Sequence, residues 1–341
     1  MDRCVRLITV RASSMDIKDL AGLSEPLKRL IEVISDGIGA VSRPYLIRKT
    51  ADAKAYEIKA IAQAMAETQK LLTNSEYEDG KVKVISPDVQ PDDMPLLSNR
   101  VTARLQYQEL HQQQNVEAVC ANAAEELAQE KSVPNEKPEP EWVSRFMDIS
   151  SGISTEELQH MWGRILAGEI KRPGSFSLRT LDVLRNLSRK EAENFVNLGN
   201  YILRSGDKYV YIDPKAFIFT KDNGLTFLDL LVLKDAGLIF ESNLEISFPP
   251  LGAGEASQLI YGPLILLFER DKDTSKLASA VGVLTKVGVE LLQLITIQPD
   301  MEYVSFVGKS FRADGVKFAW APIVQYLGEQ IRYGNKTYVE P

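Results

Sequence analysis

The residues best suited to chemistry lie in one stretch, MWGRILAGEIKRPGSFSLRTL, which spans residues 161–181. Gly168 and Gly174 bracket a basic segment there, as glycines do in phosphate-binding loops. A Walker loop needs four residues between its glycines and Lys-Ser or Lys-Thr directly after the second, because the lysine must reach the phosphates. Here five residues intervene and Ser-Phe-Ser follows. The spacing excludes a Walker loop and favours a tight turn between two helices.

A second interpretation of the same turn is a weak anion site. The helix that begins after Gly174 has free N–H groups at its start, and such groups bind anions. We therefore treat the charged residues of this stretch as the candidate ligand or partner contacts. They are Arg164, Glu169, Lys171, Arg172 and Arg179. A helix–turn–helix corner is nevertheless the expected main role of the turn.

Glu169 and Trp162 each have two interpretations, one functional and one structural. Glu169 follows apolar residues three and four positions earlier, so we expect it to cap the turn or to pair with Arg164 or Arg172. A catalytic carboxylate would need a second catalytic partner, and the sequence shows none. Trp162 shares the apolar register of its predicted helix, so we expect it in the core.

Other reactive side chains are few and scattered. His111 and His160 belong to separate predicted helices with no Cys or His at ligand spacing, so we expect no metal and no cofactor. Cys4 and Cys120 lie far apart, which argues against a disulfide framework and for a reducing compartment. No nucleophile elbow or zinc-protease motif occurs. The sequence favours a non-enzymatic protein with no assigned catalytic residue, although a hydrolase with an unrecognised site is left open.

The composition is that of a globular protein, and we expect a cytoplasmic location. The 341 residues can form two or three domains, and a formal charge of −7 argues against binding polyanions over the whole surface. The amino terminus lacks the pattern of a secretory signal, and no window of 18 apolar residues occurs. Association with the inner membrane through a peripheral amphipathic helix stays open.

The first half of the chain has a helical pattern that ends in a proline-rich segment. Residues 1–132 form the predicted N-terminal helical region, for oligomerisation or membrane association, with an irregular excursion at 74–98. Residues 133–141, VPNEKPEPE, contain three prolines and four charges, so we predict a linker.

The second half changes from a helical to a strand-like period. Residues 142–205 form a predicted helical core unit, in which Ser154 with Glu157 and Ser188 with Glu191 read as capping boxes. Residues 206–341 read as short strands and helices, which suits a winged-helix-like domain. The predicted fold class is α+β, with an N-terminal α-helical region, a central helical bundle and a C-terminal winged-helix-like α+β part.

The predicted helix at 44–72 has a surface of small residues that favours self-association. Its stripe consists of Ala51, Ala55, Ile58, Ala62 and Met65. Such a stripe is best buried against identical copies, so we expect a homo-oligomer, either a dimer or a tetramer. The alternative is an intramolecular bundle with the predicted helix at 99–131.

Several runs of residues resemble a known family. WGRILAGEIKRPGSFSLRTL and LSRKEAENF, followed by LKDAGLI and LTKVGVELLQLI, resemble a bacterial family described only as a domain of unknown function, over roughly 140–300. More distantly, the order of parts is similar to abortive-infection alpha proteins, which are associated with phage defence. The resemblance supplies no established catalytic residues.

The resemblance implies a non-enzymatic effector in antiviral, abortive-infection-like defence that is oligomeric and acts on a membrane or forms a pore. Eight basic and six acidic residues in 24–72 suit a membrane surface or an acidic partner. The alternative is a sensing module for nucleic acid or an oligonucleotide messenger. Expected partners are copies of the chain, a membrane surface, an oligonucleotide ligand and an enzyme encoded nearby.

Overall fold

The computed structural model divides into two compact units, Met1–Ser175 (unit 1) and Phe176–Pro341 (unit 2), each of which is described by itself. The described residues are 23–38, 76–78, 81–83, 97–212, 217–218, 225–240, 244–249, 252–273, 276–328 and 330–339. The predicted helix at 44–72 and its stripe of small residues lie outside them.

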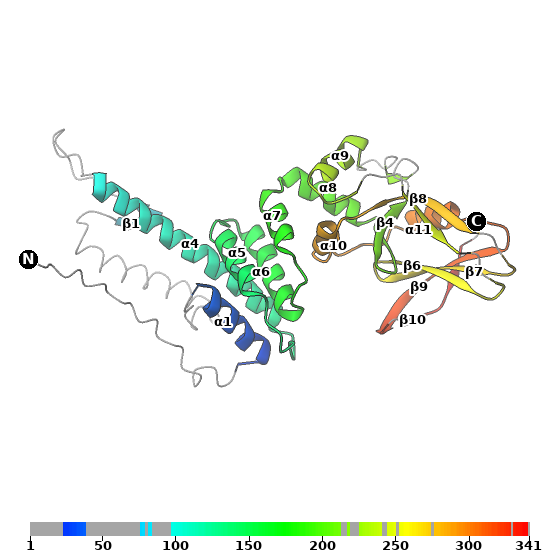
Figure 1. Cartoon of the computed structure of the whole chain (residues 1–341), viewed down its shortest axis with the longest axis horizontal. Coiled ribbons are helices and arrows are strands. Elements are labelled where there is room, and N and C mark those ends of the chain that lie inside the picture. The colour runs from blue at the N-terminus through cyan, green and yellow to red at the C-terminus, as the bar shows by residue number, and fades with distance from the viewer. Residues whose placement is uncertain are drawn as a thin grey trace, which may run out of the picture. The chain divides into compact units, whose positions relative to one another are not determined.

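Unit 1 is a helical assembly with one small hairpin (Figure 1). Its elements are α1 (Glu25–Ile38), β1 (Glu76–Glu78), β2 (Lys81–Lys83), α4 (Leu97–Leu127), α5 (Pro140–Ser150) and α6 (Glu156–Lys171). The helices α1, α4, α5 and α6 contact one another, and β1 pairs with β2 in antiparallel fashion. The helices on either side of the proline-rich segment therefore share one core.

Close approach of α6 to α4 depends on Gly163. A Cβ at this position would lie 2.5 Å from the Asn122 Cβ and 2.9 Å from the Ala123 backbone nitrogen. Beside this crossing, the rings of Trp142 and Phe146 stack with centroids 5.0 Å apart, and Trp162 lies 5.4 Å from Phe146. Trp162 is 1% exposed, which confirms the prediction that it belongs to the core.

Unit 2 combines helices with an antiparallel sheet that has nine strands among the described residues. Its helices are α7 (Leu178–Asn186), α8 (Arg189–Gly199), α9 (Phe227–Asp235), α10 (Lys286–Leu292) and α11 (Met301–Ser310). Its strands are β3 (Leu203–Ser205), β4 (Lys208–Ile212), β5 (Leu244–Phe248), β6 (Ala256–Tyr261), β7 (Leu264–Arg270), β8 (Leu277–Val283), β9 (Val316–Leu327), β10 (Gln330–Tyr333) and β11 (Thr337–Tyr338). The strand order is β10-β9-β7-β6-β3-β4-β8-β5, and β11 also pairs with β9.

The strand β7 lies inside the sheet and is buried on both faces. Its alternating residues divide between two clusters: Leu266 and Phe268 join the main core, while Ile265 and Leu267 pack with Ala321 on the other face. The run LILLF therefore shows no polar alternation, as expected for a strand covered on both sides. The helix α11 contributes Tyr303, Val304 and Val307 to the main core, and its C-cap residue Phe311 joins them.

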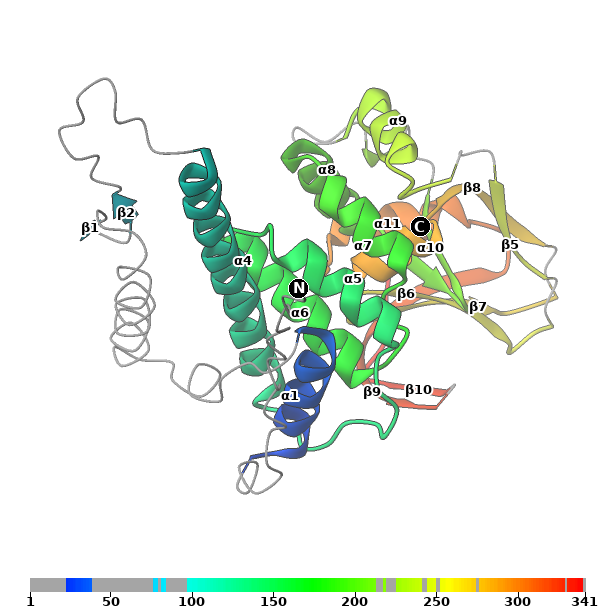
Figure 2. The same ribbon diagram turned by 60° about the vertical axis from the view of Figure 1, so that its left-hand side comes forward.

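A second core lies among α8, α9 and α10. It includes Leu198 from α8, Leu233 from α9 and Leu291 from α10, and Figure 2 shows α8 and α9 side by side. The hydroxyl of Tyr303, a buried main-core residue, accepts from the Ile212 N–H at 3.2 Å. It donates at 2.9 Å to the carbonyl of Tyr201, a residue that packs against both cores. Burial of this phenol raises the pKa of Tyr303 far above its usual value.

The α+β class and the N-terminal helices are confirmed. Short strands and helices are present in residues 206–341 as predicted, and the strands belong to one large antiparallel sheet. The winged-helix-like arrangement stays a prediction. The unit boundary at Ser175 falls inside the predicted 142–205 unit, and Val133 of the predicted 133–141 linker is buried. The ranges 1–132, 142–205 and 206–341 stay a prediction, which limited proteolysis can test.

The two predicted capping boxes have different outcomes. Ser188 and Glu191 form a complete box at the start of α8, as predicted. The helix α6 begins one residue later than Ser154 requires: Thr155 is its N-cap, and no side chain caps the helix there. The Ser154–Glu157 box is therefore wrong, because Glu157 does not reach the third helical position that a box requires.

Candidate functional site

The turn after α6 is fixed by its own polar groups. Gly174 has a φ of 82°, in the left-handed region, where a side chain would be strained. Its N–H donates to the buried Glu169 carboxylate at 2.6 Å. Arg172 Nε donates to Ser175 Oγ at 3.2 Å, and the Ser175 hydroxyl donates to the Arg172 carbonyl at 2.5 Å. Glu169 therefore holds the turn, in the capping role that the sequence predicts.

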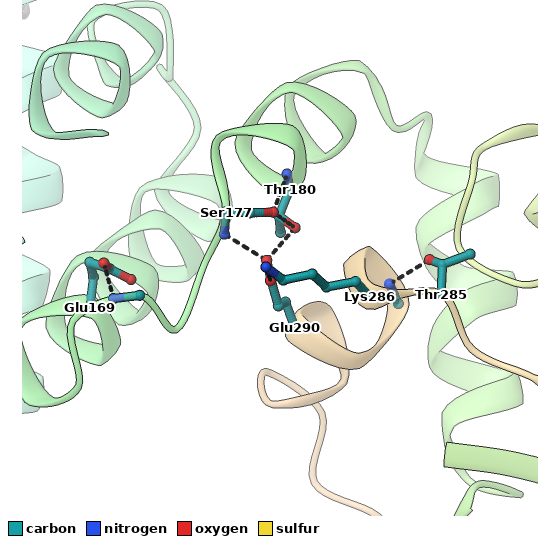
Figure 3. Close-up of polar contacts among 8 residues, drawn as sticks. Glu169, Ser177, Thr180, Thr285, Lys286 and Glu290 are labelled. Atoms are coloured by element: carbon teal, nitrogen blue, oxygen red, sulfur yellow. Dashed lines mark hydrogen bonds and ion pairs between the residues drawn. The ribbon is translucent and has the colours of Figure 1, made fainter. Parts of the chain in front are cut away.

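The start of α7 is occupied by a carboxylate of the chain itself. Glu290 of α10 accepts a hydrogen bond from the Ser177 N–H at 2.6 Å and another from the Thr180 hydroxyl at 2.5 Å (Figure 3). Ser177 is also the N-cap of α7, because its hydroxyl accepts from the Thr180 N–H. Helix starts favour negative charge. The anion expected at this helix start is therefore a glutamate 113 positions along the chain.

The second oxygen of Glu290 faces a lysine. Oε1 is buried and has no hydrogen bond with a described residue, but it lies 3.7 Å from the Lys286 Nζ. The lysine side chain is 80% exposed and the glutamate side chain 7% exposed. Solvent weakens an ion pair with one partner so exposed. The two hydrogen bonds to Oε2 therefore hold the carboxylate, and Lys286 adds a weaker attraction.

The helix that carries Glu290 is itself fixed against the preceding turn. The Thr285 hydroxyl accepts from the Gly288 N–H at 3.1 Å and donates to the Gly237 carbonyl at 2.6 Å. A Cβ at Gly288 would lie 2.2 Å from the Leu238 carbonyl oxygen, so only glycine allows this approach. These contacts fix the position from which Glu290 reaches α7.

The five predicted site residues divide between the two units. Lys171 pairs with Glu130 at 3.4 Å, and Arg164 is half-buried on α6. Glu169 and Arg172 share the turn described above, whereas Arg179 belongs to α7 in unit 2. Arg179 is exposed and borders a cavity of about 460 Å³ that Asp182, Asn186 and Glu191 also line.

The Glu290 cluster is built as a structural clamp. Thr180 is fully buried, and the Ser177 hydroxyl lies 3.1 Å from the Thr180 hydroxyl, so both hydroxyls are engaged inside the protein. A general base must reach a proton of the substrate. Glu290 instead accepts hydrogen bonds from a backbone N–H and a buried hydroxyl. These two contacts join α7 to α10.

The remaining reactive side chains are also apart. His111 packs edge-on against Tyr107, and His160 lies 4.0 Å from Glu126. Burial raises the pKa of the Cys120 thiol, and the nearby charge of Glu117 adds to the rise, which keeps it protonated. Among the described residues no group of three His, Cys, Asp or Glu side chains is placed to hold a metal ion. Within the same residues, no helix has the length and apolarity to cross a membrane.

Sequence reasoning missed the residues that matter most in unit 2. Glu290 is a single acid inside the apolar helix KVGVELL, and that isolation was the available signal for a buried, partnered carboxylate. Asp229 closes a capping box with Thr226 at the start of α9, a pattern with Asp in place of the usual Glu or Gln. Neither contact partner of Glu290 could be deduced from local spacing.

Comparison with known proteins gives one match. A family model described as "Protein of unknown function (DUF2806)" matches residues 99–307. No curated protein and no solved structure matches the chain. The match supports the predicted resemblance to an uncharacterised family and extends it to include α4. The more distant similarity to abortive-infection alpha proteins stays a prediction.

Proposed function

We propose that this chain, which belongs to the DUF2806 family of unknown function, acts without catalysis by pairing copies of itself through α4. The setting that we propose is an antiviral, abortive-infection-like response. The observation that carries the pairing is the exposed amino-terminal half of α4. The support for the antiviral setting is the order of sequence parts shared with abortive-infection alpha proteins.

The two halves of α4 differ in burial. The helix has 31 residues and a length of about 46 Å at the usual rise of an α-helix. Its carboxyl-terminal half is buried in the core of unit 1 through Val116, Val119, Cys120, Ala123, Ala124 and Leu127. In its amino-terminal half, Leu97, Val101, Leu105 and Tyr107 are between 37% and 67% exposed.

The exposed apolar residues of α4 are arranged as a stripe. Leu97, Val101 and Leu105 are four residues apart and so lie on one face of the helix. An antiparallel pair with a two-fold axis at Val101 would place Leu97 of one copy against Leu105 of the other. Such a self-complementary contact is the usual form of a symmetric dimer interface.

Pairing would also stabilise the amino-terminal half of α4, where Leu97, Val101 and Leu105 are exposed. Helices are marginal in water when they are not packed, and their stability comes mainly from burying an apolar face. Removing this stripe from water contributes about 25 cal/mol for each Å² of apolar surface. The stripe is narrow, so we propose a dimer.

Light scattering on the full chain tests the pairing. We expect a mass of about twice the 38.1 kDa of one chain, and a monomer for Val101→Arg, because two cations would then meet at the axis. The matched control is Gln106→Arg, which adds the same charge on another face of α4. A monodisperse monomer for the unmodified chain would sink the proposal and favour an intramolecular partner for α4.

Disulfide trapping tests the register in solution. In a Cys4→Ser background, Val101→Cys should give a covalent dimer on mild oxidation, because each cysteine meets its own copy at a two-fold axis. Gln106→Cys is the control and should stay monomeric under the same conditions. Equal trapping of both variants would rule out the stated axis.

Phage challenge tests the antiviral setting. Cells that produce the chain should resist infection, cells with Val101→Arg should lose resistance, and cells with Gln106→Arg should keep it. Equal resistance with all three chains would show that resistance does not depend on pairing through α4. Leakage of dye-filled liposomes tests the membrane-acting form, which stays a prediction.

The alternative role is an oligonucleotide sensor, but α10 has little positive charge for binding phosphates. Lys286 is the one cation of this helix, and it faces Glu290. Nucleic-acid binding relies on several cations that contact phosphates. Titration with single-stranded and double-stranded oligonucleotides at low salt tests this role, and saturable binding would favour it over the pairing proposal.

A further inference from the structure

A cavity of about 630 Å³ lies in unit 2, between α11 and the strands β7, β9 and β11. Its apolar lining comes from Phe268, Phe311, Val316, Phe318 and Val339. The volume is in the range of small-molecule sites. Much of the lining lies beyond residues 99–307, so the family match covers only part of the cavity.

The aromatic side of the cavity is firmly packed. The Phe268 ring lies 5.1 Å from both the Phe311 and the Phe318 ring centroids. Gly308 of α11 faces Phe318 so closely that a Cβ would lie 2.4 Å from the ring. The rings are therefore held in place before any ligand arrives, which lowers the entropy cost of binding.

The acids that line the cavity already have cationic or hydroxyl partners. Glu269 accepts hydrogen bonds from Lys336 and from the Tyr338 hydroxyl, the latter at 2.9 Å. Burial by itself would raise the pKa of Glu269, but these two hydrogen bonds outweigh burial and hold the pKa below its usual value. Asp271 pairs with Lys317 at 3.0 Å. Both acids are thus paired with neighbouring groups.

Two cations of the lining have no such partner. Lys309 in the last turn of α11 and Arg312 just after it are exposed, and neither forms an ion pair with a described residue. Both side chains line the same cavity, so their charges lie near one another there. The positive charge that remains at the cavity is therefore concentrated on Lys309 and Arg312.

We infer that this cavity binds a small aromatic anion. A flat apolar body would lie against Phe311 and Phe318, and a phosphate or carboxylate would accept hydrogen bonds from Lys309 and Arg312. Arginine suits such groups because its guanidinium donates two parallel hydrogen bonds. Ser305, also in the lining, offers a further hydroxyl.

A helix end explains part of the same charge without a ligand. Cations near the last turn of a helix are favoured by its dipole, and Lys309 occupies such a position. That explanation gives no role to the aromatic rings and predicts no saturable binding. The two explanations therefore differ in a measurable way.

Calorimetric titration of the full chain with naphthyl phosphate tests the inference, with naphthol as the uncharged probe of the same shape. We expect one saturable site for naphthyl phosphate and at least about tenfold weaker binding of naphthol, since charged hydrogen bonds are the stronger ones. Equal affinity for the two probes would overturn the anionic part of the inference.

Two variants locate the site. Lys309→Ala with Arg312→Ala should weaken naphthyl phosphate by about tenfold or more, since it removes both charged donors. The matched control, Arg189→Ala with Lys190→Ala on α8, removes the same charge elsewhere and should bind as the unmodified chain does. Ser305→Trp should block the cavity, and its melting temperature shows whether the fold is kept.

Absence of saturable binding to the unmodified chain would end the inference, as would unchanged binding to the Lys309 and Arg312 variant. The result is independent of pairing through α4. Dimer mass is measured by light scattering and depends on unit 1, whereas probe affinity depends on unit 2. Failure of one proposal therefore leaves the other intact.

Discussion

Unit 1 and unit 2 hold their helices together by opposite means. In unit 1, α6 approaches α4 because Gly163 has no side chain, and a Cβ there would meet the Asn122 Cβ at 2.5 Å. In unit 2, α7 is joined to α10 by the Glu290 carboxylate, 2.6 Å from the Ser177 N–H. The first contact depends on volume, and the second on directed hydrogen bonds to a charge.

The two contacts should therefore respond to different kinds of substitution. A core set by close packing is sensitive to the volume of its side chains. A contact set by a buried carboxylate is sensitive to loss of the acceptor, because the donors are then left without a partner. Local stability can be measured in each unit through amide hydrogen exchange of its own peptides.

The largest effect should come from Trp162→Ala in unit 1. Trp162 is 1% exposed, and truncation of such an aromatic residue costs about 3–5 kcal/mol of folding free energy. Thermal melting and hydrogen exchange should show the loss in unit 1. Leu158→Ala, at a 43% exposed position of the same helix, is the control and should change little. An unchanged melting temperature would contradict the packing account.

Glu290→Ala should have the next largest effect, in unit 2. It removes the acceptor of the Ser177 N–H and the Thr180 hydroxyl, at a cost of about 2–4 kcal/mol for two buried donors. Glu290→Gln should cost less, because an amide oxygen still accepts. Lys286→Ala should cost under about 0.5 kcal/mol, since its ion pair is mostly exposed. Chemical denaturation measures all three, and equal losses would contradict the clamp.

Gly163→Ala should have a smaller effect, again in unit 1. The added methyl would lie 2.9 Å from the Ala123 backbone nitrogen, so the two helices must move apart, at a cost of about 1–3 kcal/mol. Gly152→Ala is the matched control, because its added methyl has no contact nearer than 3.6 Å. If both variants melt alike, close approach at Gly163 is not what holds α6 to α4.

Acid should produce the smallest effect, through α9 in unit 2. Hydrogen bonds from the Thr226 side chain and backbone lower the pKa of Asp229, and the Asn194 amide adds to this effect. A lowered folded pKa stabilises the protein above the ordinary value of about 3.9, and that contribution is lost as pH falls through the folded pKa. The stability gap between the unmodified chain and Asp229→Asn should therefore shrink in acid. A stability gap that is constant with pH would contradict the lowered pKa of Asp229.

Features that depend on local spacing could be predicted from the sequence. The helical pattern of residues 142–205 predicted α6, α7 and α8, and Ser188 with Glu191 marked the start of α8. The glycine spacing at 168–174 excluded a Walker loop, and Trp162 was assigned to the core from its register. Each of these depends on residues within a few positions of one another.

Which distant residues meet depends on the packing of the whole fold. The anion at the start of α7 is Glu290, and nothing near Ser177 in sequence specifies it. Short strands after residue 206 were predicted from their own residues, but the hairpin of β3 and β4 and its place inside the large sheet depend on pairing with β6 and β8. Helix patterns repeat over a few residues, so local spacing is enough to predict them. The partners of β3 and of Glu290 lie more than fifty positions away in the sequence, so only packing of the whole fold determines them.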